Sequence, residues 1–191
     1  MSKEELTDSE LLVLGLVAEM PRHGYDLEHV IAERAMREWT QIGFSSIYYL
    51  LNKLEKKGLV EAKAPASAKA KKIYNMTAAG EEALVNQTLA ALSTIRPTYS
   101  SLLMGMIHWS VLTRDQALAA LQTRKEAVAE ELKRLEDIHF DQQPLPDYVD
   151  TMFDFSIGQL QAEAAWIIKT LEYMQTKPWN AENPSNIEKW T

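Results

Sequence analysis

The sequence predicts a mainly α-helical fold that contains one small β-hairpin, and two observations predict it. One is a stripe of apolar residues at helical spacing, which marks one face of an amphipathic helix: Ile47, Leu50, Leu51 and Leu54. Gly58 supplies the conformation that ends this helix. The other is a pair of short extended segments, residues 59–63 and 72–76, around a small-residue loop, residues 64–70. A helix followed by such a hairpin is the order of a winged helix-turn-helix.

Two further helices are expected before the helix that carries this stripe. Thr7 and Glu10 have the spacing of a capping box, which opens the first helix, and Pro21 ends it. Gly24 is expected to provide a tight turn. The second helix then has its own buried stripe: Leu27, Val30, Ile31 and Ala35. This stripe is expected to hold the following helix at a fixed angle.

A fourth helix is expected after the hairpin, because Thr77 is a capping residue and Pro97 punctuates the end of the segment. We place the boundary of the winged helix-turn-helix domain near the start of this helix, so that the domain covers residues 1–85. Residues 86–176 are expected to form a helical linker and dimerisation domain, and residues 177–191 a C-terminal tail.

The side of this helix opposite the apolar stripe, from Ser45 to Lys56, is built from hydrogen-bond donors. Each of them is able to contact a phosphate or a base edge. They are Ser45, Ser46, Tyr48, Tyr49, Asn52, Lys53 and Lys56. The same spacing occurs on ordinary solvated helices, so this face alone leaves DNA recognition and a plain surface helix evenly balanced.

The distribution of charge favours DNA recognition. Residues 53–72 contain seven lysines and two acids, whereas the whole chain has a net charge of −7. A basic region in an acidic protein is typical of a surface that binds a polyanion. Lys69, Lys71 and Lys72 belong to the loop and second strand of the hairpin, where they are expected to contact phosphates.

Several motifs of the first 85 residues resemble the PadR family of bacterial transcriptional regulators. They are His23-Gly24-Tyr25-Asp26-Leu27, Ser46-Ile47-Tyr48, Gly58-Leu59-Val60 and Tyr74-x-Met76-Thr77-x-x-Gly80. The resemblance implies a winged helix that binds operator DNA. The chain departs from the family at Tyr49, where the family often has proline, so the resemblance does not say which bases are read.

The second half of the sequence predicts two long helices that together resemble a coiled coil. The first of these helices has an a/d-like seam of apolar residues: Leu118, Leu121, Val128, Leu132 and Leu135. The second and last helix begins at Pro146 or Asp147. The apolar arc of the last helix is too wide for a lone surface helix, so a second copy of the chain is expected to cover it. The larger subgroup of the PadR family is similar here and dimerises through this part. The candidate dimerisation residues are Leu121, Val128, Leu132, Leu135, Leu160, Ile167 and Leu171. About half of them are equally well explained as contacts between the two helices of one chain.

Composition argues against an enzyme or a membrane protein. The chain has no cysteine, and its four histidines show no metal-ligand spacing. It has no Gly-rich phosphate loop and no nucleophile elbow, and Glu126, Glu130 and Glu131 fit a solvated helix face. We therefore expect no catalytic residue, metal or cofactor. The hydrophilic start and the lack of a long apolar run predict a cytoplasmic protein without a signal peptide.

The segment that joins the two halves is a candidate effector pocket, because aromatic and methionine side chains gather there: Tyr99, Met104, Met106, His108 and Trp109. For any one of them, packing in the core is the commoner role. Relatives of the resembled family include regulators that respond to phenolic acids or to other small aromatic and cationic compounds. The sequence thus predicts a homodimeric repressor that binds a pseudo-palindromic operator and responds to a small aromatic ligand. The alternatives are a winged-helix adaptor for protein partners and a small-molecule binding protein without DNA-binding activity.

Overall fold

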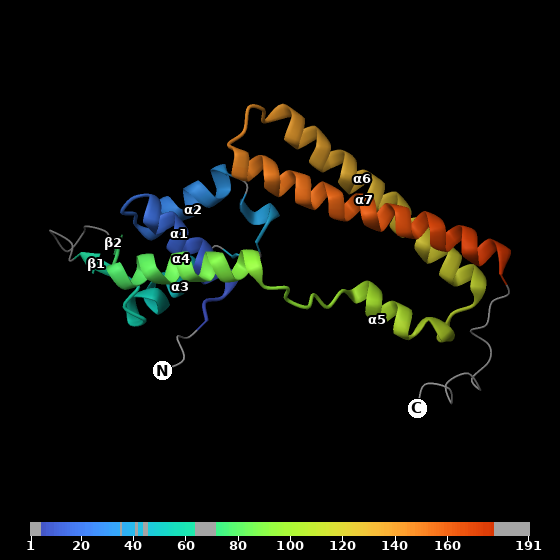
Figure 1. Cartoon of the computed structure of the whole chain (residues 1–191), viewed down its shortest axis with the longest axis horizontal. Helices are drawn as coiled ribbons and strands as arrows, with labels where there is room; N and C mark the ends of the chain where they lie inside the picture. Colours follow the sequence, from blue (N-terminus) through green and yellow to red (C-terminus); the bar gives the residue numbers. More distant parts are fainter. Residues whose placement is uncertain (1–4, 35, 41, 44–45, 64–71, 178–191) are drawn as a thin grey trace. The chain divides into compact units, whose positions relative to one another are not determined.

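The structure is a computed structural model, which describes residues 5–34, 36–40, 42–43, 46–63 and 72–177 (Figure 1). The chain divides into two compact units, Met1–Pro97 and Thr98–Thr191. The predicted fold class is confirmed: the chain is mainly helical and has one two-stranded antiparallel hairpin. The division falls after Pro97, later than the boundary expected near residue 85, because α4 (Ala78–Ser93) packs on α1 (Asp8–Glu19) within the first unit.

The start of α1 is fixed by the predicted capping box. The Thr7 hydroxyl accepts a hydrogen bond from the Glu10 backbone N–H at 3.3 Å, and the Glu10 carboxylate accepts one from the Thr7 N–H at 2.8 Å. The helix ends at Glu19, two residues before Pro21. Its apolar residues fill the core of the first unit: Val13, Leu14, Leu16 and Val17.

Gly24 has a different role from the tight turn that we expected. It is the first residue of α2 (Gly24–Glu33), and His23 is the N-cap, its Nδ1 accepting a hydrogen bond from the Asp26 N–H at 3.1 Å. A Cβ at Gly24 would lie 2.5 Å from a ring carbon of Tyr48. A side chain at this position would therefore require the Tyr48 ring, which packs against the start of α2, to move.

Helix α3 (Ser46–Lys56) follows the short 3₁₀ helix η1 (Met36–Glu38) and buries the predicted stripe completely or nearly so. The most buried members, Ile47, Leu51 and Leu54, have 0% of their surface exposed. Gly58 ends the helix with a φ of 70°, in the left-handed region that glycine adopts without strain. The stripe thus fixes which side of α3 faces solvent.

The hairpin consists of β1 (Val60–Lys63) and β2 (Ile73–Met76), which pair antiparallel with Val60 opposite Met76. Backbone hydrogen bonds in both directions between Tyr74 and Arg22, of 2.8 and 3.2 Å, attach β2 to the turn between α1 and α2. The base of the wing is therefore tied to the same core that holds α3. The intervening loop lies outside the described residues.

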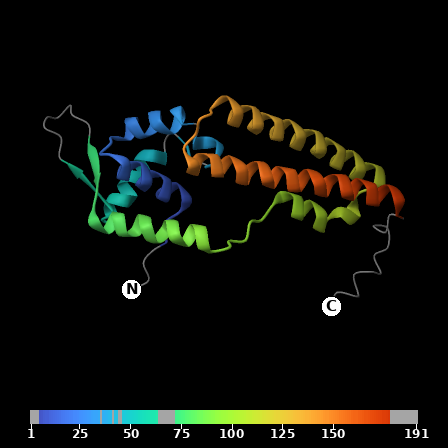
Figure 2. The ribbon, with the colours of Figure 1, turned by 45° about the horizontal axis from the view of Figure 1, so that its top comes forward.

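The second unit is a pair of long antiparallel helices preceded by a short helix (Figure 2). Helix α5 (Ser101–Ile107), which the sequence did not predict, and the 3₁₀ helix η2 (Trp109–Val111) lead into α6 (Arg114–Asp141) and α7 (Asp147–Thr176). At one end the Arg114 guanidinium donates to the backbone carbonyls of Met174 and Gln175, the last turn of α7. Among the described helices, none is long and apolar enough to span a membrane.

Candidate nucleic-acid interface

The solvent-facing side of α3 presents a continuous set of polar side chains. Tyr49 is 66% exposed, and Asn52 and Lys56, which follow it at helical spacing, are also exposed. Ser46 is half-buried at the start of the helix. The apolar stripe is on the opposite side, so the structure gives these residues the orientation that the sequence predicted. Ser45, Lys69 and Lys71 lie outside the described residues.

Tyr48 and Tyr49 are adjacent in sequence but differ in surroundings. The Tyr48 ring, 49% exposed, packs against the backbone of Gly24 at the start of α2. Tyr49 projects from the next position of the helix and is the more exposed of the two. Tyr48 therefore has a packing role besides any contact that it makes with a ligand, whereas the ring of Tyr49 is available for recognition.

Lys53 is not oriented as an outward-facing contact. Its ammonium lies 3.2 Å from Oε1 of Glu10, and the ammonium of Lys57 lies 2.9 Å from the same oxygen. Glu10 is fully buried. Burial raises its pKa, but the Thr7 backbone N–H and the ammonium groups of Lys57 and Lys53 outweigh burial and lower the pKa from 4.5 to about 2.

The sequence interpretation missed this ion-pair cluster because it assigned Glu10 only to the capping box. A signal was present. Glu10 precedes Val13, Leu14 and Val17 at spacings of three, four and seven, so it occupies a position in the buried stripe of α1. A carboxylate at such a position requires a charged partner, and the nearby lysines of α3 supply it.

The wing adds positive charge at the side of α3. Lys63 at the end of β1 and Lys72 before β2 are both exposed. The Lys72 ammonium lies 3.7 Å from a carboxylate oxygen of Glu55, and its side chain remains 56% exposed. Lys72 thus combines a loose contact with α3 and a charge that is accessible from solvent.

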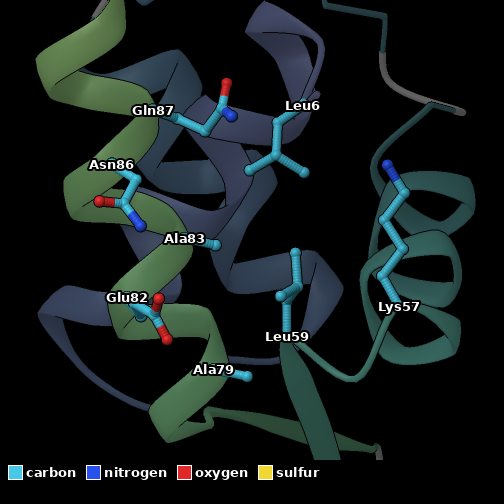
Figure 3. A pocket seen from close by; sticks show the side chains of 8 residues that line it. All are labelled: Leu6, Lys57, Leu59, Ala79, Glu82, Ala83, Asn86 and Gln87. Atoms are coloured by element: carbon cyan, nitrogen blue, oxygen red, sulfur yellow. The ribbon is translucent and has the colours of Figure 1, made fainter. Parts of the chain in front are cut away.

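A cavity of about 280 Å³ lies between the end of α3 and α4 in the first unit. Figure 3 shows Lys57, the residue after α3, on one side, residues of α4 on the other, and Leu6 and Leu59 between them. The α4 side chains are Ala79, Glu82, Ala83, Asn86 and Gln87. The sequence interpretation did not identify this cavity, because its lining comes from three separate segments of the chain.

The expected effector residues are not enclosed together within one chain. Tyr99 is 86% exposed before α5, and Met104 and His108 are exposed as well. Met106 is half-buried, and Trp109 packs against a small core of Ala117, Leu121 and Met174. The proposal that these five residues bind a ligand stays a prediction.

The candidate dimerisation residues divide into two groups. Leu121, Val128, Leu135 and Ile167 are buried within a single chain, whereas Leu132, Leu160 and Leu171 are half-buried. The first group therefore packs within the second unit. Exposed apolar side chains occur instead on another face of α7, where Tyr148, Met152 and Phe155 follow one another at helical spacing.

Comparisons with known proteins agree with this geometry. Residues 13–86 match the model of the family described as transcriptional regulator PadR-like. A comparison with curated protein sequences finds no match.

Solved structures resemble the chain over most of its length. The crystal structure of Bacillus subtilis PadR in complex with operator DNA has a TM-score of 0.68 and 18% identity, and covers 88% of this chain and 99% of that chain. The crystal structure of the same protein in complex with p-coumaric acid has a TM-score of 0.69 and 19% identity, and covers 87% of this chain and 98% of that chain. The crystal structure of the PadR-like transcriptional regulator BC1756 from Bacillus cereus has a TM-score of 0.62 and 20% identity, and covers 90% of this chain and 100% of that chain.

At these identities the structural likeness establishes the fold, and the family model matches the chain over residues 13–86. Residues 13–86, which include the winged helix-turn-helix, are similar to the PadR-like family of transcriptional regulators.

Proposed function

We propose that this protein is a homodimeric repressor that binds a pseudo-palindromic operator through the exposed face of α3. The observation that carries the proposal is the polar face of Tyr49, Asn52 and Lys56, exposed above a buried apolar stripe in a domain similar to the PadR-like family. The related Bacillus subtilis PadR has been crystallised with operator DNA.

The chemistry of this face suits duplex DNA. Asn52 offers an amide, which is able to donate and accept at once, as an adenine edge in the major groove requires. Tyr49 offers a phenol, and Lys56 a charge for a phosphate. The wing lysines, Lys69, Lys71 and Lys72, are assigned to flanking phosphates. Positive charge here, on a chain with a net charge of −7, directs a polyanion to this part of the surface.

A dimer is the second part of the proposal. One recognition helix reads few base pairs, whereas a two-fold dimer presents two such helices to half-sites about 34 Å apart. The apolar face of α7 that includes Tyr148, Met152 and Phe155 is exposed in the single chain. A second copy of the chain would remove this apolar surface from water.

Selection from a random duplex library, followed by anisotropy titrations at several salt concentrations, tests the proposal. We expect enrichment of a sequence with dyad symmetry and an affinity that falls steeply with salt. Reporter transcription from the selected site should decrease when the protein is expressed. A protein-binding adaptor would show neither salt-dependent affinity nor enrichment, and that result would refute DNA recognition.

Regulation by a small aromatic acid extends the proposal, because Bacillus subtilis PadR has been crystallised with p-coumaric acid. The residues assigned to such a ligand are Tyr99, Met104, Met106, His108 and Trp109. If the ligand shifts the population away from the DNA-competent dimer, its affinity and the affinity for DNA must be reciprocally linked. Titration of p-coumaric acid into the protein with and without operator measures this linkage, and equal ligand affinity in both titrations would exclude it.

A further inference from the structure

Glu10 is the one charged or polar residue among the fully buried large side chains of the described chain. It lies in the first turn of α1, and its carboxylate has two kinds of partner. One oxygen accepts a hydrogen bond from the Thr7 backbone N–H, while the other lies 3.2 Å from the ammonium of Lys53, in α3, and 2.9 Å from that of Lys57, the residue after α3. The same side chain therefore both caps α1 and contacts the recognition helix.

The spacing of the two lysines explains how one carboxylate reaches both. Lys57 directly follows α3, and its backbone N–H donates to the Lys53 carbonyl at 3.0 Å, so the two side chains lie on the same side, one helical turn apart. Because the Glu10 carboxylate lies between the two ammonium groups, it restrains the end of α3 against α1. The restraint opposes both sliding of α3 along its own axis and rotation of α3 about that axis. Leu50 and Leu54 of the apolar stripe lie close to the same side of α3 and pack against the core. Apolar packing without the ion pairs would allow α3 to rotate more.

The cluster also changes which charges α3 offers to DNA. The Lys57 side chain is only 13% exposed and that of Lys53 is 34% exposed, and both ammonium groups are directed to Glu10. Lys56, between them in sequence, is exposed on the polar face. Three lysines in one short segment therefore divide into two that face inward and one that faces outward.

We propose that Glu10 is a positioning residue for DNA recognition, which holds Lys53 and Lys57 against α1 so that α3 presents Lys56, and not Lys53, to the phosphates. This inference rests on the proposed DNA-binding function. It assigns to Lys53 an internal role in place of the phosphate contact expected from the sequence.

The salt dependence of binding to one selected duplex tests the inference with a matched pair of variants. Lys56→Met removes a phosphate contact and should flatten the plot of log affinity against log salt by about 0.9, the value for one contact. Lys53→Met, the same substitution one turn away, should leave the slope of the wild type unchanged. Glu10→Gln keeps the capping box but removes the charge, and should steepen the slope by about 0.9 for each lysine that it releases. In the double variant that combines Glu10→Gln with Lys53→Met, the slope should be less steep by about 0.9 than in Glu10→Gln alone.

Two results would overturn the inference: a slope flattened by Lys53→Met as much as by Lys56→Met, or a slope that Glu10→Gln leaves unchanged. If Glu10→Gln does not fold, the comparison of the two lysine variants decides alone. A wild-type protein whose affinity for duplex DNA does not depend on salt would refute the proposed function, and the inference with it. A wild type that binds with a steep slope, beside a Lys53→Met variant with a flattened one, refutes only the inference.

Discussion

Gly80, in the first turn of α4, lies directly against the backbone carbonyl of Leu59: a Cβ at Gly80 would be 2.0 Å from that oxygen. The same carbonyl accepts hydrogen bonds from the backbone N–H of Thr77 at 3.2 Å and from its hydroxyl at 3.1 Å. The start of α4 is therefore docked on the chain just before β1. This contact joins the wing to the helix that follows it.

Gly80→Ala should destabilise the winged helix, because backbone would have to move to admit the methyl group. We expect a loss of about 1–3 kcal/mol in the free energy of unfolding, measured by denaturant titration. Gly15→Ala in α1 is the matched control, since its Cβ would meet nothing closer than a Leu84 methyl at 3.9 Å. This control should be neutral or gain up to about 1 kcal/mol from helix propensity. Equal effects of the two substitutions would contradict the close approach of α4 to Leu59.

Asn52→Ala should relax base preference without abolishing binding. Asn52 is exposed on the polar face of α3, where its amide is free to pair with a base edge. Loss of a good direct contact costs about 1–3 kcal/mol, and only at the base pairs that it reads. Affinities for the operator and for all its single-base variants measure this. Lys56→Met serves as the control, because loss of a phosphate contact weakens every sequence equally. A uniform loss with Asn52→Ala would assign Asn52 to a phosphate.

Acid should remove the stabilisation that Glu10 provides. Its pKa in the folded chain is about 2, below the ordinary value of 4.5. A group with a lowered pKa stabilises the fold above its unfolded pKa, and that stabilisation is lost as the pH falls from 4.5 towards 2. The difference corresponds to about 3 kcal/mol. Glu19, Glu131 and Asp150 also have lowered pKa values and contribute to acid sensitivity.

Comparison with Glu10→Gln isolates the contribution of Glu10, because the other carboxylates titrate equally in both proteins. We expect the wild type to exceed the variant in free energy of unfolding at pH 6, and the excess to shrink steadily towards pH 2. Denaturant titrations across this range measure it. A constant difference would mean that the carboxylate of Glu10 titrates normally in the folded chain.

The parts of this fold that the sequence predicts correctly are those that depend on residues close together in the chain. The stripe from Ile47 to Leu54 and the stop at Gly58 depend on neighbours within one helix, and both are confirmed. Gly24 and Glu10 were assigned incomplete or wrong roles because their partners, Tyr48 and the lysines of α3, lie in another helix. The spacing of apolar residues shows which face of a helix is buried, but it does not identify the residues that cover that face.

The same limit applies to the candidate dimer residues. An apolar seam has the same spacing whether it packs within a chain or between two chains. Leu121, Val128, Leu135 and Ile167 proved to be buried within one chain, which the sequence had left open. The exposed side chains of α7 became candidates only when the packing of α6 on α7 was known. The loop lysines Lys69 and Lys71 lie outside the described residues, so their assignment still depends on charge alone.

Phe155→Asp should weaken the proposed dimer and, through it, binding to the operator. Phe155 is 66% exposed in the single chain, so the substitution should leave the monomer folded. A buried aromatic residue at an interface typically contributes about 2 kcal/mol or more, which corresponds to a dissociation constant more than tenfold higher. Thr123→Asp adds the same charge to an exposed position of α6 and should change neither the dimer dissociation constant nor the affinity for the operator.

Sedimentation equilibrium measures the dimer dissociation constant, and fluorescence anisotropy measures the affinity for duplexes with one and with two half-sites. If Phe155→Asp remains as dimeric as the wild type, the apolar face of α7 is not the interface. A loss of affinity confined to the two-half-site duplex would show that dimerisation couples the two recognition helices.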